Sequence, residues 1–177
     1  DPAELRRGVG AALGGSDLVV AVGGVSMGDK DHLPAVFESL GVERLFHGVS
    51  VQPGKPVWAG RRGGCFVLGL PGNPVSSFVI LELFGVPLVQ RLGGAGAVVV
   101  PRPLETGVCA SSKGAKKRPR FVLADLETDG DGRDLVRARP EAGSGDWTAL
   151  AGAQALVFLA PGSRGEPGHP VRFLRLA

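Results

Sequence analysis

The sequence predicts an α/β domain followed by a small all-β, barrel-like domain. Up to residue 94, short continuous apolar runs bounded by glycine alternate with helix-forming segments, and beyond it short strand-like runs alternate with turns. Continuous apolar runs are typical of strands covered on both faces, so the sheet of the first domain is predicted to be mostly parallel. The predicted domains are residues 1–94 and 95–177, joined at the glycine-rich stretch 93–96.

The first domain is predicted to alternate between helices and strands. Its expected elements are a helix over residues 1–13, a strand over 17–22, a helix over 33–40, a strand over 47–51, a strand over 65–68 and a helix over 75–92. Asp1 and Pro2 suit the N-cap and first position of the first helix. The last helix is apolar nearly all round, so we expect it in the core or in a subunit contact, with a kink or break at Pro87.

Residues 65–83 contain a strand, a glycine-rich turn and a helix start in direct succession. In the turn Gly69-Leu-Pro-Gly-Asn-Pro74, Asn73 suits the N-cap and Pro74 the first helical position. Free backbone N–H groups and the positive end of the helix dipole then favour an anion, and Ser76 adds a hydroxyl group. A plain turn between strand and helix uses the same residue types, so geometry alone leaves both interpretations open.

A second glycine-rich loop, residues 23–31, follows the strand over 17–22. Ligands of parallel sheets bind outside the carboxyl ends of the strands, so we expect both loops to face one crevice. The carboxylates of Asp29 and Asp31 suit Mg²⁺ or the activation of a nucleophile. Capping of the next helix is the alternative; we favour capping for Asp29 and the anion site for Asp31. The residues expected in this crevice are Gly23, Gly24, Ser26, Gly28, Lys30, Gly72, Asn73 and Ser76.

The turn Gln52-Pro-Gly-Lys-Pro56 presents one cation, Lys55. A lone lysine in a turn is usually solvated. A third loop at the same edge of the sheet with a positive charge would, however, suit an anionic ligand.

Composition limits the classes of function. Gly and Pro make up 43 of 177 residues, but 44% of the residues are hydrophobic, which favours a folded chain with many turns. A net charge of +3 is too small to indicate a nucleic-acid partner by itself. Cys65 and Cys109 lack metal-ligand spacing and are predicted to be reduced, structural thiols. No signal peptide opens the sequence and no uninterrupted apolar run reaches 18 residues, so we expect a cytoplasmic protein without a membrane partner.

The second domain is predicted to be a small barrel or sandwich. Its expected strands cover residues 98–100, 120–125, 134–138, 155–159 and 171–175. Asp129-Gly-Asp-Gly132 is a hairpin turn signal. A basic run contains Lys113, Lys116, Lys117, Arg118 and Arg120. With only Phe121 as an aromatic neighbour, a solvated loop is favoured over a nucleic-acid patch.

Three motifs in this order and at these spacings resemble the molybdopterin molybdotransferase family, to which bacterial MoeA and the gephyrin E domain belong. They are GGVSMGDKD at residues 23–31, QPGKP at 52–56 and GLPGNPVS at 69–76. The resemblance implies a partial α/β pterin-binding domain followed by the family's C-terminal β-barrel. It implies insertion of molybdate into adenylylated molybdopterin with release of AMP, a requirement for Mg²⁺ and a homodimer, and we add a molybdopterin adenylyltransferase as a further partner.

The resemblance also implies roles for individual residues. Asp31 matches the family's essential aspartate, as catalytic residue and Mg²⁺ ligand. The residues placed around molybdate are Pro53, Gly54, Lys55, Ser76, Arg118 and Ser144. Gly48 and Gln52 stand at positions that are often lysine in the family, which implies either weaker capture of molybdate or substitution by another residue. Leu123 stands where many members have a second arginine, which weakens the assignment of molybdate contacts in the barrel. Family members are more than twice as long, with N-terminal domains and a first half of the pterin domain, so the chain is predicted to match the C-terminal portion only. The alternative is a non-catalytic pterin-binding or assembly module.

Overall fold

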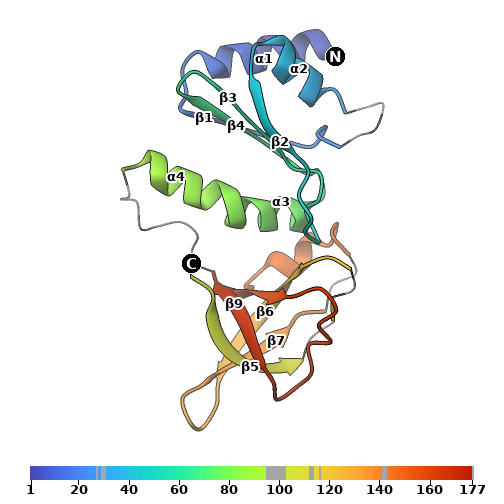
Figure 1. Cartoon of the computed structure of the whole chain (residues 1–177), viewed down its shortest axis with the longest axis vertical. Coiled ribbons are helices and arrows are strands. Elements are labelled where there is room, and N and C mark those ends of the chain that lie inside the picture. The colour runs from blue at the N-terminus through green and yellow to red at the C-terminus, as the bar shows by residue number, and fades with distance from the viewer. Residues whose placement is uncertain are drawn as a thin grey trace. The chain divides into compact units, whose positions relative to one another are not determined.

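The computed structural model describes residues 1–26, 28, 31–94, 103–111, 114–115, 117–140 and 143–176 (Figure 1). The chain divides into two compact units, one of residues 1–49 with 54–100 and the other of residues 50–53 with 101–177. The predicted strand over 98–100 lies outside the described residues, as do Asp29, Lys30, Lys113 and Lys116.

The first unit is built on a four-stranded sheet in the order β1-β4-β3-β2. Its strands are β1 (Leu18–Val22), β2 (Glu43–His47), β3 (Trp58–Arg62) and β4 (Cys65–Leu70). The α/β class is confirmed, but the sheet is mixed rather than mostly parallel. Only β1 and β4 run parallel, whereas β4–β3 and β3–β2 are antiparallel. For β3 and β4 the reason is local, because Gly63 and Gly64 alone connect them and a connection of two residues can join only antiparallel strands.

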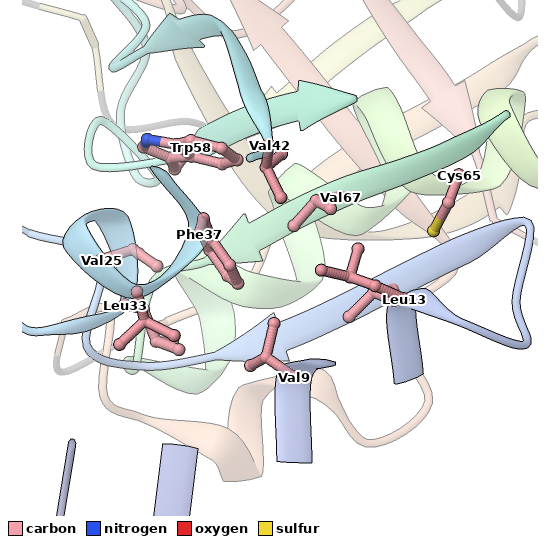
Figure 2. Close-up of a cluster of buried hydrophobic side chains, with 11 residues drawn as sticks. Val9, Leu13, Val25, Leu33, Phe37, Val42, Trp58, Cys65 and Val67 are labelled. Atoms are coloured by element: carbon pink, nitrogen blue, oxygen red, sulfur yellow. The ribbon is translucent and has the colours of Figure 1, made fainter. Parts of the chain in front are cut away.

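The two predicted helices are present as α1 (Pro2–Leu13) and α2 (Leu33–Ser39), and both cover one face of this sheet (Figure 1). The Asp1 side chain caps α1 by accepting a hydrogen bond from the N–H of Ala3. Figure 2 shows side chains of the cluster that fills this face, among them Phe37 and Trp58, whose ring centroids lie 4.7 Å apart. Burial of these apolar side chains fixes the position of both helices on the sheet.

The other face carries one long helix made of α3 (Pro74–Ile80), a π-helical turn η1 (Leu81–Gly85) and α4 (Val86–Leu92). Pro87 does not break it. Pro87 has no N–H for an α-helical hydrogen bond, and the wider π turn lies directly before it. By length and composition, Pro74–Leu92 could cross a membrane, a test that core helices also pass. Val75, Val79 and Ile80 in its first segment are buried, whereas Val89 and Leu92 near its end are exposed.

The strand predicted over 47–51 is wrong in position. The strand in this region, β2, ends at His47, where the predicted strand begins. Gly48 follows with a φ of +85°, a conformation that takes the chain out of the extended region, and residues 50–53 belong to the second unit. The strand β3 was not predicted.

The second unit is a closed barrel in the order β5-β7-β6-β8-β9. Its elements are β5 (Glu105–Ser111), β6 (Arg120–Thr128), β7 (Asp134–Ala138), the 3₁₀ helix η2 (Trp147–Leu150), β8 (Ala155–Leu159) and β9 (Pro170–Arg175). The predicted hairpin turn is confirmed, because Gly132 N–H donates to the Asp129 carbonyl between antiparallel β6 and β7. The strand β5 was missed because its buried positions are Gly107 and Cys109, which give no apolar alternation.

Candidate functional site

The two predicted glycine-rich loops meet at the carboxyl ends of β1 and β4. The N–H of Gly23 donates a hydrogen bond of 2.9 Å to the Leu70 carbonyl, one residue beyond the last strand pair. A Cβ built on Gly72 would lie 3.5 Å from Gly23 Cα, so the two loop backbones are in contact. The structure therefore brings Gly23 and Gly72, one from each predicted loop, close together.

The loop after β1 is anchored by groups that sequence reasoning missed. Val25 is buried, and its Cγ1 lies 2.6 Å from where a Cβ on Gly69 would be, so only glycine fits at that point of β4. The Val25 carbonyl accepts a hydrogen bond of 2.8 Å from Nε2 of His47, at the end of β2. No motif marks His47, and only the register between β2 and the loop reveals this role. The neighbouring Ser26 is exposed.

Asp31 closes the same loop on itself. Its Oδ2 accepts a hydrogen bond of 3.0 Å from the N–H of Gly28, and its own N–H donates to the Gly28 carbonyl. The N-cap of α2 is His32, not Asp31. Among the described residues, the hydrogen bond of the Asp31 carboxylate thus serves the loop rather than the helix N-terminus. The carboxylate is half-buried and keeps acceptor capacity, because an ionised carboxylate offers about four lone-pair sites.

The turn after β4 places the helix start as predicted. Asn73 takes the N-cap position with an extended backbone, and Pro74 is the first helical residue. The Ser77 hydroxyl donates to the Pro71 carbonyl, which ties the first turn of α3 to the preceding loop. Ser76 is buried, with a side chain packed inside the unit rather than displayed on its surface.

The turn over residues 52–56 is divided between the two units. Gly54 belongs to the first, with a φ of +114°, and a Cβ there would lie 2.6 Å from Ile80 Cγ1 and 3.6 Å from the Ser76 carbonyl oxygen. Gly54 and Ser76, both predicted near molybdate, are therefore neighbours. The Lys55 side chain is exposed, while its carbonyl accepts from the N–H groups of Val49 and Val57.

The remaining predicted residues lie in the second unit. Gln52 extends the sheet there, since its N–H donates to the Pro119 carbonyl and its carbonyl accepts from the Phe121 N–H. This pairing brings Pro53 to the segment that carries Arg118. Ser144 lies in a turn closed by the hydrogen bond from Asp146 N–H to the Gly143 carbonyl. Both Arg118 and Ser144 are half-buried.

A cavity of about 540 Å³ also opens on the second unit, beside the loop between β8 and β9, and holds none of the predicted residues. Cys109 lines it, and burial raises the pKa of this thiol. Within the described parts of the chain, no three His, Cys, Asp or Glu side chains gather as a metal site.

The fold is that of an α/β protein with a parallel strand pair and two adjoining glycine-rich loops, in a chain that also forms a small closed barrel. The chain belongs to the family described as "Probable molybdopterin binding domain", whose model matches residues 1–91. It is similar to the molybdopterin molybdenumtransferase of Staphylococcus aureus (strain Mu50), with 34% identity over 156 residues, and to that of Bacillus subtilis, with 33% over 165. The resemblance inferred from the three motifs is thereby confirmed.

These relatives are much longer. The S. aureus match covers 88% of this chain but 37% of the relative, and the B. subtilis match 89% and 36%. The chain thus spans a little over a third of their length. Among solved structures, the molybdopterin biosynthesis MoeA protein of Pyrococcus horikoshii has a TM-score of 0.76 at 29% identity, over 99% of this chain and 41% of that one. A molybdenum cofactor biosynthesis protein of Pyrococcus furiosus shares the fold, with a TM-score of 0.68 at 24% identity.

Proposed function

We propose that this chain forms part of a molybdopterin molybdotransferase and acts in molybdenum cofactor biosynthesis. In the proposed reaction, adenylylated molybdopterin takes up molybdenum from molybdate and releases AMP. Family membership and the printed names of the relatives support the link to molybdopterin and to molybdenum transfer.

The observation that carries the proposal is the contact of Gly23 and Gly72 at the carboxyl ends of β1 and β4. Neither residue has a side chain, so a ligand can approach the backbone of both loops, although the Gly23 N–H itself is engaged by the Leu70 carbonyl. The N-terminus of the helix that begins at Pro74 adds the positive end of its dipole. Backbone N–H groups and a helix N-terminus favour the pyrophosphate of an adenylylated pterin. Ser26, Gly28 and Asn73 border the same loops and are proposed to contact this ligand.

Asp31 is the proposed catalytic residue. Its carboxylate is held by Gly28 N–H, so it is oriented before a ligand arrives. Mg²⁺ is typically bound by one or two carboxylates together with substrate phosphates and water. A single aspartate beside the proposed phosphate-binding loops is consistent with this type of coordination. Asp31 would hold the ion, which when bound would offset the negative charge of the phosphates.

Molybdate is proposed to be bound by Pro53, Gly54, Lys55, Ser76, Arg118 and Ser144, as the family resemblance implies. Lys55 and Arg118 supply the positive charge that a tetrahedral dianion requires. Gly54 lies against the helix that carries Ser76, which supports their joint role. Gly48, Gln52 and Leu123 supply no charge at positions that are often basic in the family, so the proposed affinity for molybdate is modest.

The test is AMP release from adenylylated molybdopterin with molybdate and Mg²⁺ by the purified chain. We expect release that requires molybdate, and Asp31→Asn should reduce it by at least a hundredfold. Lys55→Ala should raise the molybdate concentration needed for half-maximal release, whereas Lys117→Ala, which removes another exposed lysine, should not. AMP release by the Asp31→Asn variant at the rate of the unaltered chain would refute the assignment.

A second candidate is a non-catalytic pterin-binding or assembly module. The two adjoining glycine-rich loops support binding of a phosphate-containing ligand whether or not catalysis takes place here. This candidate predicts that the chain binds adenylylated molybdopterin in calorimetry and that Gly72→Val abolishes the binding. It also predicts that AMP release stays at the background level. Light scattering of the chain, alone and with a molybdopterin adenylyltransferase, tests the proposed homodimer and partner.

A further inference from the structure

Arg139 of the second unit joins two segments that are separate in the sequence. It follows directly after β7, and its Nε donates a hydrogen bond of 2.7 Å to the Asp125 carboxylate on β6. Its Nη1 donates to the carbonyl oxygens of Ala149 and Ala151, at 2.9 and 2.5 Å. These two residues lie at the end of the 3₁₀ helix η2. One guanidinium group therefore binds both a barrel strand and the end of a short helix.

The chemistry of this contact suits arginine in particular. The last carbonyl groups of a helix have no partner within the helix. A guanidinium group presents several N–H donors in one plane, so it can bond a carboxylate and carbonyl groups at once, whereas an ammonium group is a compact point charge. The Arg139 side chain is only 19% exposed. A Cβ on Gly152 would lie 3.5 Å from its Nη2, so the chain that follows η2 also packs against the guanidinium group.

A neighbouring ion pair on the same two strands differs from this arrangement. Arg137 on β7 pairs with Glu127 on β6 at 3.3 Å, and both side chains are about half exposed. Among the described residues, the Arg137 side chain donates hydrogen bonds to Glu127 alone. Exposed pairs of this kind contribute little to stability. Arg139 is the more buried of the two arginines, and it connects the barrel strands to a segment outside them.

The segment that Arg139 holds also contains Ser144. The backbone N–H groups of residues 146, 147, 149 and 151 donate to carbonyl oxygens two or three residues before them. Residues 143–151 therefore form one hydrogen-bonded segment, with Ser144 near its start and the carbonyl groups bound by Arg139 at its end. The position of Ser144 depends on where this segment is held, and Arg139 is its charged attachment to the barrel strands.

We propose that Arg139 is a positioning residue that acts through Ser144 on molybdate. This inference rests on the proposed function, which places Ser144 against molybdate. Groups that bind a ligand must be held by contacts behind them, because a displacement of about 1 Å greatly weakens their effect. Arg139 supplies such a contact by holding residues 143–151, and it touches no ligand itself. Asp125 belongs to the same arrangement, since its carboxylate orients the guanidinium group.

The first measurement follows the segment itself and needs no ligand. Arg139→Lys keeps the charge but loses the planar set of donors, so amide exchange of Trp147, Ala149 and Ala151, followed by NMR, should speed up at least tenfold. Arg137→Lys makes the same change at the exposed pair and should leave these amides unchanged. The amides of β8 should exchange at the same rate in both variants, which shows that the barrel stays folded.

The second measurement is the Kd for molybdate, obtained by calorimetry with the purified chain, with and without adenylylated molybdopterin. Arg139→Lys should raise this Kd at least fivefold, whereas Arg137→Lys should not change it. Ser144→Ala should also raise it, and adding Arg139→Lys to Ser144→Ala should raise it no further, because the positioned hydroxyl group is then absent. A general loss of barrel structure would instead weaken binding in both backgrounds.

A second variant tests the same contact from its other side. Asp125→Asn keeps the shape of the side chain and removes the charge that orients Arg139. It should speed amide exchange in residues 147–151 and raise the Kd for molybdate, in both cases by less than Arg139→Lys does.

The outcomes separate this inference from the proposed function. The positioning role is overturned if Arg139→Lys leaves either the amide exchange or the Kd unchanged. It is also overturned if Arg139→Lys raises the Kd by the same factor with and without Ser144. Each of these results leaves the proposed function standing. An unaltered chain that binds no molybdate at millimolar concentration would refute the proposed molybdate site, and the role of Ser144 with it.

Discussion

The backbone N–H of Gly23 donates a 2.9 Å hydrogen bond to the carbonyl oxygen of Leu70 and so joins the ends of β1 and β4. Gly23 makes this bond with a φ of +84°, a conformation that costs a residue with a side chain about 1–2 kcal/mol. The positive φ explains why the loop after β1 begins with glycine. The bond also sets the position of the loop relative to Gly72.

Gly23→Ala should therefore mainly lower stability, whereas Gly72→Ala should mainly weaken ligand binding. Gly23→Ala should lower the free energy of unfolding by about 1–2 kcal/mol, as measured by urea denaturation. Gly72→Ala should change stability by less than about 0.5 kcal/mol, since its Cβ meets Gly23 Cα at an ordinary 3.5 Å. Its methyl group should instead weaken calorimetric binding of adenylylated molybdopterin. Equal losses of stability in both variants would contradict this division.

Gly69→Ala should destabilise the first unit by about 1–3 kcal/mol, because a Cβ there lies 2.6 Å from Val25 Cγ1 and 3.3 Å from Trp58 Cβ. The double variant Gly69→Ala with Val25→Ala should lose less than the sum of the single changes, since Val25→Ala empties the contested space. Chemical denaturation measures all three. Gly64→Ala, at a position open to solvent space, is the control and should be nearly neutral. Strict additivity would show that the two residues do not share this space.

His47 should act through the proton on Nε2. A carbonyl oxygen only accepts hydrogen bonds, so the 2.8 Å contact with the Val25 carbonyl requires Nε2–H. His47→Leu should cost about 1 kcal/mol of stability and speed amide exchange in residues 23–26. His47→Gln, whose amide can donate from a similar position, should recover most of both effects. The exposed His169 provides the control, and His169→Leu should leave exchange in this loop unchanged.

The two cysteines should make the protein less stable at high pH. Burial is the main cause that raises the pKa of both Cys65 and Cys109, and for Cys65 the nearby Asp17 charge adds to it. The folded state therefore keeps its thiol protons above pH 9.0, the ordinary thiol value, where the unfolded state loses them. Since the unfolded state then binds fewer protons, stability falls as pH rises from about 9 through the folded pKa values. Urea midpoints between pH 7 and 10.5 should show this fall.

A Cys65→Ala, Cys109→Ala variant is the control for this pH dependence. It should lose the part of the decline that the thiols cause, although its stability at pH 7 will be lower because both side chains are buried. Identical slopes in the variant and the unaltered protein would assign the decline to other groups.

Most helices and strands could be predicted because their signals are local. The α1 helix follows from apolar spacing and the Asp1 cap, and β8 from a continuous apolar run. The missed elements lack such signals. The strand β5 presents Gly107 to the barrel interior, where a Cβ would lie 2.7 Å from the Asp134 carbonyl oxygen. Because only glycine fits there, the strand lacks the apolar side chain that would have marked it in the sequence.

The candidate site divides in the same way. The glycine loops, Asn73 and Asp31 are visible as motifs, because their chemistry depends on residue type and spacing. His47, Val25 and Gly69 are not, because their roles arise from contacts between segments that are distant in sequence. The division of the turn over 52–56 between two units was equally hidden, since it rests on hydrogen bonds from Gln52 to Pro119 and Phe121.

The sequence by itself determined the class of fold, the two glycine-rich loops and the family, because periodicity, turn chemistry and motif spacing are properties of short segments. Only the tertiary structure decided that the sheet is mixed, that β1 lies at one of its edges and that His47 holds the loop after it. The physical reason is that strand order and direction depend on hydrogen bonds and packing between distant segments, to which local propensity is indifferent.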